Sequence, residues 1–354
     1  MSFDMPTLQD RSENQRKVFL DWLRVFAFFS VLVWHFFYLD LRDQLTNPEL
    51  NGLIRGLLEL LLPFMRGNVG VTVFFLVSGY IITHVLYEQN SLEFVIKRAF
   101  RIYPLYIVTV LITYLIAWEK PDFSILIPQL LLIGDVFHTP YALGGIEWTL
   151  RVEMMFYIIM GALKFMGFFD AKKQALPWVF VIAAVGANYF SPFPSWIDIT
   201  KANYSIAFQF LFLGCVIYLY DIKKVNWMFL IFFIVLVFYD AYHLINLYHL
   251  DFKNDTYPIL AFGVFVSVWL IRERLKINPV VGFLSNLTFA VYVLHTTVLG
   301  VLELCDSKYL HIQSKVVFGT ILMTVLIVIC YLLHRWVEKP FNKIGKALAS
   351  RKSY

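Results

Sequence analysis

Long apolar runs dominate this chain, and short polar stretches separate them. Ten of the runs approach the roughly 20 residues that a helix needs to cross a bilayer. The predicted spans are residues 18–39, 69–88, 102–118, 148–166, 175–190, 203–220, 225–242, 256–271, 284–303 and 316–335. The pattern therefore predicts an all-α protein, a polytopic transmembrane helical bundle of about ten spans.

One further apolar run, residues 123–137, fits this pattern poorly. It contains Pro128 and ends at Gly134 and Asp135, which makes it short for a membrane span. We expect residues 123–147 to form an outer-face or re-entrant segment that does not cross.

Positive charge supports that interpretation, because Lys and Arg concentrate on the cytoplasmic side of membrane proteins. If residues 123–137 do not cross, the segments on the side of the termini hold 20 Lys and Arg residues and the opposite segments hold 8. If they did cross, the bias would largely vanish. We expect both termini to be cytoplasmic, with an N-terminal tail over 1–17, a transmembrane domain over 18–337 and a C-terminal tail over 338–354.

Composition confines the chain to the membrane class. Hydrophobic residues make up 59% and charged residues 16% of its 354 residues, whereas soluble proteins average about 25% charged. We expect membrane lipid around the chain and no nucleic-acid partner. The first apolar run is too long for a cleavable signal peptide, and we expect no appended soluble domain. Cys215, Cys305 and Cys330 are scattered, with neither a disulfide framework nor metal-ligand spacing, so we expect no metal.

The first span contains three ionisable residues, Asp21, Arg24 and His35. Arg24 and His35 are eleven positions apart, close to three helical turns, so they share a face about 16 Å apart along the axis. The pattern places a cation near one end and a proton-transfer group near the other. Each residue also has a structural explanation. Arg24 could pair with Asp21 or extend to the headgroups, and His35 could join helices by a hydrogen bond.

A carboxylate in the fourth span, Glu153, lies about two turns from the end that we expect to be outer. His35 is expected at a similar depth. A carboxylate beside an imidazole can orient the ring, as general-base catalysis requires. The alternative partner for Glu153 is Arg151, but residues two apart on a helix do not face each other.

Arg98 and Arg101 are three apart on a predicted helix, so they point the same way. Paired arginines suit a phosphate or carbonyl-rich ligand, although positive charge at the inner face is also ordinary anchoring. In the second span, Ser78 and Gly79 would allow close helix approach. His295 is the other mid-membrane histidine, and we interpret it as a structural hydrogen-bonding residue.

Several motifs, taken in order along the chain, resemble those of the acyltransferase-3 family of integral-membrane O-acyltransferases. The resemblance covers nearly the whole length. The matching elements are the Arg-x10-His signature from Arg24 to His35, the glycine-rich GNVGVTVFFLVSGYIIT, the Arg-x-x-Arg element at Arg98 and Arg101, IEWTLRVEMMFY with Trp148, Glu153, Phe156 and Tyr157, LSNLTFAVYVLH and the terminal VEKPF. Thr149 stands where the family usually has Ser, and Phe289 where Tyr is common.

The resemblance implies transfer of an acyl group, usually acetyl, from cytoplasmic acyl-CoA to a hydroxyl of an envelope or secreted carbohydrate, in a bacterial inner membrane. Arg24, Arg98 and Arg101 would hold acyl-CoA. His35 would be the general base or carry a transient acyl group, and Glu153 would orient it. Trp148 could belong to an aromatic platform for a sugar ring.

Two other classes of function stay open at this stage. A secondary transporter or lipid-linked glycan flippase also fits ten spans with a few intramembrane charges. Such folds often show a matched pair of broken helices in related halves, which we do not find in the sequence. A non-enzymatic scaffold for polysaccharide assembly would leave the aligned Arg24 and His35 without a role.

Overall fold

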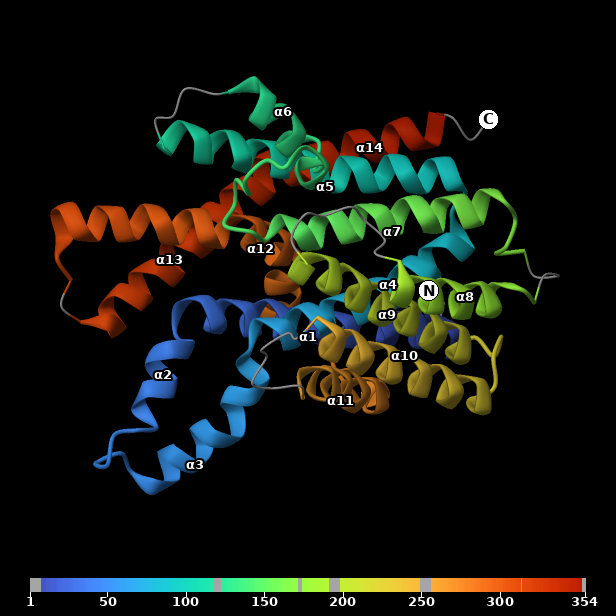
Figure 1. Ribbon diagram of the computed structural model, residues 1–354. Helices are drawn as coiled ribbons and strands as arrows, with labels where there is room; N and C mark the ends of the chain where they lie inside the picture. The colour runs from blue at the N-terminus through green and yellow to red at the C-terminus, as the bar shows by residue number, and fades with distance from the viewer. Residues whose placement is uncertain are drawn as a thin grey trace, which may run out of the picture. The chain divides into compact units, whose positions relative to one another are not determined.

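The computed structural model describes residues 8–117, 122–170, 174–190, 198–248, 256–312 and 314–351, and every regular element in these ranges is helical (Figure 1). The α-helices are α1 (Leu8–Phe36), α2 (Tyr38–Gln44), α3 (Gly52–Leu61), α4 (Gly67–Glu88), α5 (Ser91–Ala117), α6 (Phe123–Leu130), α7 (Glu147–Phe165), α8 (Leu176–Tyr189), α9 (Asp198–Asp221), α10 (Trp227–Leu247), α11 (Tyr257–Leu270), α12 (Pro279–Cys305), α13 (Lys315–Leu333) and α14 (Lys339–Arg351). Short 3₁₀ or π turns are η1 (Leu62–Met65), η2 (Gly134–Phe137), η3 (Arg272–Arg274), η4 (Asp306–Leu310) and η5 (His334–Glu338).

Each of the ten predicted spans falls on a helix. Within the described residues, seven segments are long and apolar enough to cross a membrane, and they include α1, α4, α5, α9, α10, α12 and α13. The helices α8 and α11 have 14 residues each, and α7 has 19 residues with several charges. The all-helical fold is confirmed, and the seven candidate spans fit a membrane protein. Ten crossings and the sidedness of the termini remain predictions, and the loop with Lys172 and Lys173 lies outside the described residues.

The apolar run at 123–137 is broken into short elements. Asp122 caps α6 by accepting a 2.9 Å hydrogen bond from the Ser124 backbone N–H. Eight residues of α-helix reach only about 12 Å, against about 30 Å of hydrocarbon. Leu132 and His138 have positive φ values of 59° and 55°, which mark sharp turns on either side of η2. This run therefore does not cross as a single helix, as the sequence predicts.

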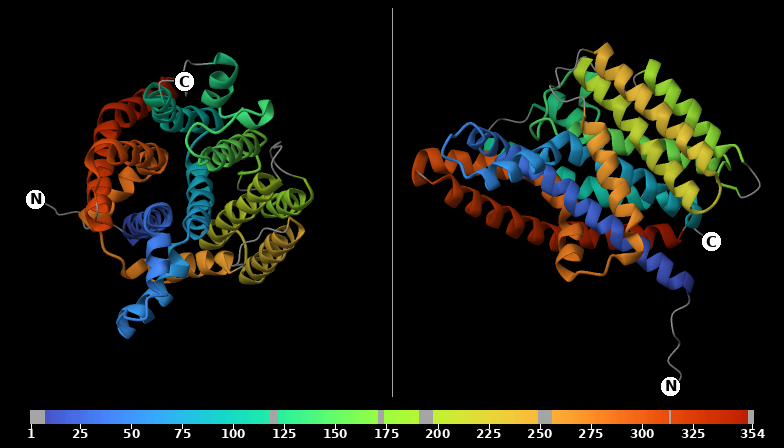
Figure 2. Two further views of the ribbon diagram at one scale, coloured as in Figure 1. Left: turned by 60° about the vertical axis from the view of Figure 1, so that its left-hand side comes forward. Right: turned by 90° about the horizontal axis from the view of Figure 1, so that it is seen from below.

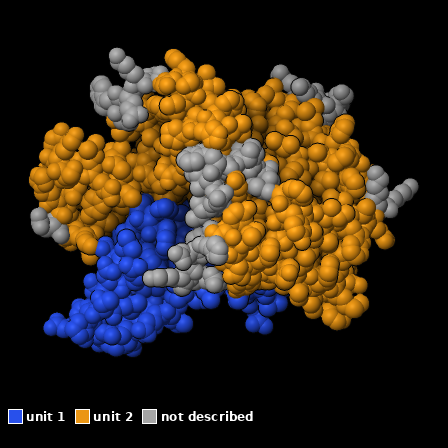
Figure 3. Space-filling view, in the orientation of Figure 1, with its two compact units in different colours: residues 1–77, 254–289 blue, residues 78–253, 290–354 orange. Residues whose placement is uncertain are grey.

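The chain divides into two compact units, coloured separately in Figure 3. The first comprises residues 1–77 and 254–289, and the second comprises residues 78–253 and 290–354. Each of α4 and α12 contributes one part to each unit.

In the first unit, α1 packs against η1, α11 and η3. A β-carbon built on Gly70 of α4 would lie 2.5 Å from the Ala27 carbonyl oxygen, so only glycine permits this approach to α1. Ser30 of α1 donates a hydrogen bond to the carbonyls of Phe64 and Arg66, at 3.0 and 2.8 Å. These contacts hold the middle of α1.

In the second unit, α8, α9 and α10 pack side by side with roughly aligned axes (Figure 2), and α7 packs between α9 and α5. A β-carbon on Gly79 of α4 would lie 1.9 Å from the Leu211 carbonyl oxygen of α9. The predicted close helix approach at Ser78 and Gly79 is therefore present.

Two boundaries differ from the sequence prediction. The helix that contains Arg98 and Arg101 begins at Ser91, so both arginines lie within α5 rather than before a span that starts at residue 102. The predicted tail after residue 337 contains the helix α14, which packs along α5.

Candidate functional site

Arg24 and His35 lie on one uninterrupted helix, α1, so the predicted shared face is real. The Arg24 Nη1 atom is 3.5 Å from Asp21 Oδ1, and Asp21 also accepts a 2.7 Å hydrogen bond from Ser285 Oγ. The structural explanation for Arg24, a pair with Asp21, is therefore present. Both side chains stay partly exposed, at 22% and 35%. His35 occupies the last turn of α1 with an exposed side chain.

Glu153 of α7 is buried, with 6% of its surface exposed. Its Oε1 atom accepts a hydrogen bond from the hydroxyl of Tyr157, one turn later on the same helix, and a 3.5 Å contact from Ser78 Oγ of α4. Glu153 does not pair with Arg151, because Arg151 is held elsewhere. A buried carboxylate with partial hydrogen bonding is costly for the fold, which favours a functional reason for its presence.

Arg98 of α5 reaches the same tyrosine. Its guanidinium carbon lies 5.5 Å from the Phe94 ring centroid and 5.6 Å from the Tyr157 ring centroid. The Arg98 Nε atom is buried, and none of the described residues accepts a hydrogen bond from it. Arg101, three residues on, lies within electrostatic range of Arg98, as does Glu153. The structure thus brings Arg98 and Glu153, which the sequence assigned to different roles, into contact with the same residue, Tyr157.

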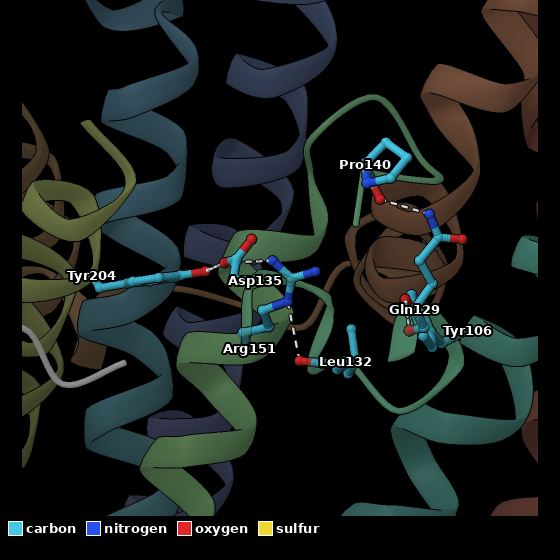
Figure 4. Close-up of polar contacts among 7 residues, drawn as sticks. All are labelled: Tyr106, Gln129, Leu132, Asp135, Pro140, Arg151 and Tyr204. Atoms are coloured by element: carbon cyan, nitrogen blue, oxygen red, sulfur yellow. Dashed lines mark hydrogen bonds and ion pairs between the residues drawn. The ribbon is translucent and has the colours of Figure 1, made fainter. Parts of the chain in front are cut away.

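A second buried cluster connects α7 with η2 and α9 (Figure 4). Arg151 Nη1 lies 2.6 Å from Asp135 Oδ2, and each side chain is only 1% exposed. Arg151 Nε donates a 3.1 Å hydrogen bond to the Leu132 carbonyl, and the Tyr204 hydroxyl donates to Asp135. The guanidinium carbon of Arg151 lies over the Tyr141 ring, 5.0 Å from its centroid. Burial raises the pKa of Tyr141, which keeps this phenol protonated.

Gln129 also holds the segment that runs from η2 into α7. Gln129 of α6 donates a 2.6 Å hydrogen bond to the Pro140 carbonyl, and its own backbone carbonyl accepts a 2.7 Å hydrogen bond from the Tyr106 hydroxyl of α5 (Figure 4). Tyr114 donates to the Gln129 side chain at 2.7 Å. The segment that leads into α7 is therefore held at two places before it reaches Trp148.

Trp148 lies in the first turn of α7, half-buried, with its ring centroid 6.4 Å from that of Tyr204. The next residue, Thr149, shares a 2.6 Å hydrogen bond with the Tyr292 hydroxyl of α12. Thr149 makes this hydrogen bond through its hydroxyl group, and the serine that is usual at this position carries the same group. His295 is fully buried, and its Nδ1 atom lies 2.7 Å from the Tyr292 carbonyl, in agreement with a structural hydrogen bond.

Sequence reasoning missed Tyr157 and Asp135 as partners of the candidate residues. Tyr157 is four residues after Glu153, a spacing that places the two on one face of a helix. Asp135 is an acidic residue inside an otherwise apolar run, which favours a buried partner. That partner, Arg151, is not recognisable from the sequence.

Comparison with known proteins assigns the chain to one family. The model of the acyltransferase-3 family, described as "Acyltransferase domain", matches residues 17–335. The acyltransferase MdmB of Streptomyces mycarofaciens is 31% identical over 26% of this chain and 27% of its own. An O-acetyl transferase of Shigella phage Sf6 is 32% identical over 27% of this chain and 34% of its own.

A third relative aligns over most of the chain. It is a Staphylococcus aureus (strain MRSA252) protein provisionally named O-acetyltransferase SAR0937, 23% identical over 95% of this chain and 59% of its own. The chain thus spans less than two thirds of the length of these relatives. No solved structure matches it. Because the family model covers the residues from the end of the N-terminal segment to η5, the chain belongs to the acyltransferase-3 family.

Proposed function

We propose that this protein is a membrane O-acyltransferase that moves an acyl group, most simply acetyl, from acyl-CoA to a hydroxyl of an envelope or secreted carbohydrate. Membership of the family and the names of the relatives support O-acyl transfer. The acyl-CoA donor, the carbohydrate acceptor and a bacterial inner membrane are our inference from the resemblance.

The observation that carries the donor assignment is the setting of Arg98. Its guanidinium lies close to two aromatic rings that also contact each other, and its buried Nε–H has no acceptor among the described residues. A buried donor without an acceptor costs about 1–3 kcal/mol. A phosphate or amide oxygen of acyl-CoA would satisfy it by a charge-assisted hydrogen bond. Arg101 and Arg24 would add charge for the same anionic ligand.

The proposed reaction uses His35 as general base. The imidazole takes the proton of the acceptor hydroxyl while the hydroxyl oxygen attacks the thioester carbonyl carbon. The C–S bond of the thioester then breaks. The released CoA thiolate recovers the proton from the imidazolium. Glu153 would orient the imidazole and stabilise its charged form. In a second route His35 first takes the acyl group and the acceptor then removes it. Trp148, supported by Tyr204, would offer an aromatic face to the sugar.

The test is an assay with purified full-length protein in detergent, radiolabelled acetyl-CoA and isolated envelope polysaccharide as acceptor. Loss of a general base typically lowers the rate by about 10²–10⁴-fold. His35→Ala should therefore lose transfer while the protein still purifies as a folded species. His243→Ala, at an exposed histidine of α10, should keep full activity.

Two outcomes would refute the proposal. One is near-normal transfer by His35→Ala, which would remove the proposed base. The other is the absence of transfer without a membrane gradient combined with gradient-dependent substrate movement in vesicles, which would favour the transporter alternative. Labelled acyl group that stays on the wild-type protein without acceptor, but not on His35→Ala, would select the covalent route.

A further inference from the structure

A basic pocket lies where α13 continues through η5 into α14, outside the cluster of Arg98 and Glu153. Its volume is about 460 Å³. The lining residues are Tyr331, Arg335, Lys339, Pro340 and Lys343. Three cations and no carboxylate line it, so the pocket suits an anion.

Helical spacing brings the three cations together. Arg335, Lys339 and Lys343 are separated by four residues each and therefore follow one face of the η5–α14 turn. All three side chains are exposed. The nearest acidic residue in sequence, Glu338, is buried and pairs with His334 at 2.7 Å, so it faces away from the pocket. The positive charge of the pocket is thus left for a ligand.

The other faces of α14 indicate what kind of anionic ligand suits this pocket. Gly345 packs against Phe100 of α5, and a β-carbon there would lie 2.6 Å from the Phe100 β-carbon. Figure 1 shows α14 alongside α5. On the opposite side of α14 from the cations, Phe341, Ile344 and Leu348 follow one another at helical spacing and are 40%, 46% and 39% exposed.

A helix with a basic face, a separate exposed apolar face and a third face against the protein is suited to the membrane interface. The apolar ridge of Phe341, Ile344 and Leu348 can enter the acyl region while the lysines extend to the headgroups. Basic pockets beside membrane helices bind anionic headgroups. A soluble phosphate ester would use the cations but leave the apolar ridge in water.

We propose that this pocket binds the phosphodiester headgroup of an anionic phospholipid and that α14 lies at the membrane interface, with its apolar ridge among the acyl chains of the surrounding lipid. Arg335 supplies a planar guanidinium that matches two phosphate oxygens. Lys339 and Lys343 add point charges beside it. The bound lipid would hold α14 against α5, the helix that also contains Arg98 and Arg101.

Native mass spectrometry of the detergent-purified full chain tests this proposal. Phosphatidylglycerol and phosphatidylcholine are titrated separately, with acetyl-CoA as a third arm. The variant Arg335→Gln/Lys339→Gln/Lys343→Gln removes the three charges and keeps polar side chains. The matched control, Lys223→Gln/Lys224→Gln/Lys276→Gln, removes three exposed charges elsewhere. Lys339→Arg/Lys343→Arg retains the charge.

The wild type should bind phosphatidylglycerol in preference to phosphatidylcholine. Affinity for phosphatidylglycerol should fall roughly fivefold per cation removed, and the control and the arginine variant should bind as the wild type does. Equal binding by the glutamine variant, or no preference for the anionic lipid in the wild type, would overturn the proposal. A glutamine variant that loses acetyl-CoA binding while it keeps phosphatidylglycerol would show that the pocket belongs to the donor instead.

Discussion

Asp135 and Arg151 form an ion pair with 2.6 Å between Oδ2 and Nη1, and both side chains are 99% removed from the surface. The pair joins η2 to the second turn of α7, two residues before Glu153. It answers two questions that the sequence raised. Arg151 does not neutralise Glu153, and the apolar run at 123–137 has a polar anchor that holds it against α7.

Removal of one partner of this pair should destabilise the protein strongly. Arg151→Met leaves the Asp135 carboxylate buried without its cation, a change that typically costs about 3–5 kcal/mol. We expect a clear fall in the unfolding temperature in detergent. Asp135→Leu/Arg151→Met should recover part of the loss, because it buries no unpaired charge. Arg42→Gln, which breaks the exposed pair with Asp43 (58% and 69% exposed), should change the unfolding temperature little. A wild-type unfolding temperature for Arg151→Met would show that the pair does not hold this segment.

Tyr157→Phe should lower turnover while acyl-CoA binding stays close to normal. The variant keeps the ring that lies 5.6 Å from the Arg98 guanidinium carbon but removes the hydroxyl that donates to Glu153. Loss of a hydrogen bond to a charged group costs about 1.5–3 kcal/mol, or roughly tenfold or more in rate if it acts in the transition state. Tyr189→Phe, at a tyrosine that is 73% exposed, is the control. Steady-state kinetics with varied acyl-CoA would contradict this role if only KM changed.

Arg98→Ala and Arg101→Ala should produce the opposite kinetic pattern. Each removes a cation that we assign to the donor, so KM for acyl-CoA should rise roughly tenfold or more, with a smaller change in turnover at saturation. Lys97→Ala is the matched control, because Lys97 lies next to Arg98 but pairs with Glu93 at 2.5 Å. If Lys97→Ala raised KM as much as Arg98→Ala, the effect would be one of general surface charge rather than of a specific site.

Gly79→Ala should destabilise the second unit, and Gly186→Ala should not. The added β-carbon at Gly79 would lie 1.9 Å from a backbone carbonyl of α9, so α4 and α9 must separate. Overpacking of this kind typically costs about 1–3 kcal/mol. Gly186 of α8 has nothing within 4 Å of its β-carbon position, and alanine there favours the helix by about 0.5–1 kcal/mol. Thermal unfolding of both variants gives the comparison, and equal unfolding temperatures would contradict the close approach.

The sequence by itself determined the class of the fold and the candidate residues. Apolar runs of bilayer length can satisfy their backbone polar groups only within helices or closed barrels, so the all-helical membrane architecture followed from composition and periodicity. The eleven-residue spacing of Arg24 and His35 gave their shared face for the same reason, because a continuous helix fixes the angle between positions. Local spacing also held the information that Tyr157 faces Glu153.

Only the tertiary structure decided which groups from different helices meet. Asp135 contacts Arg151, and Arg98 contacts Tyr157. Nothing in the sequence indicates that these segments pair with each other. Buried charges must find partners because a hydrocarbon environment does not solvate them, but that requirement does not specify the partner. The partner is set by how α5, α7 and α9 pack, and that packing depends on close approaches such as Gly79 against Leu211.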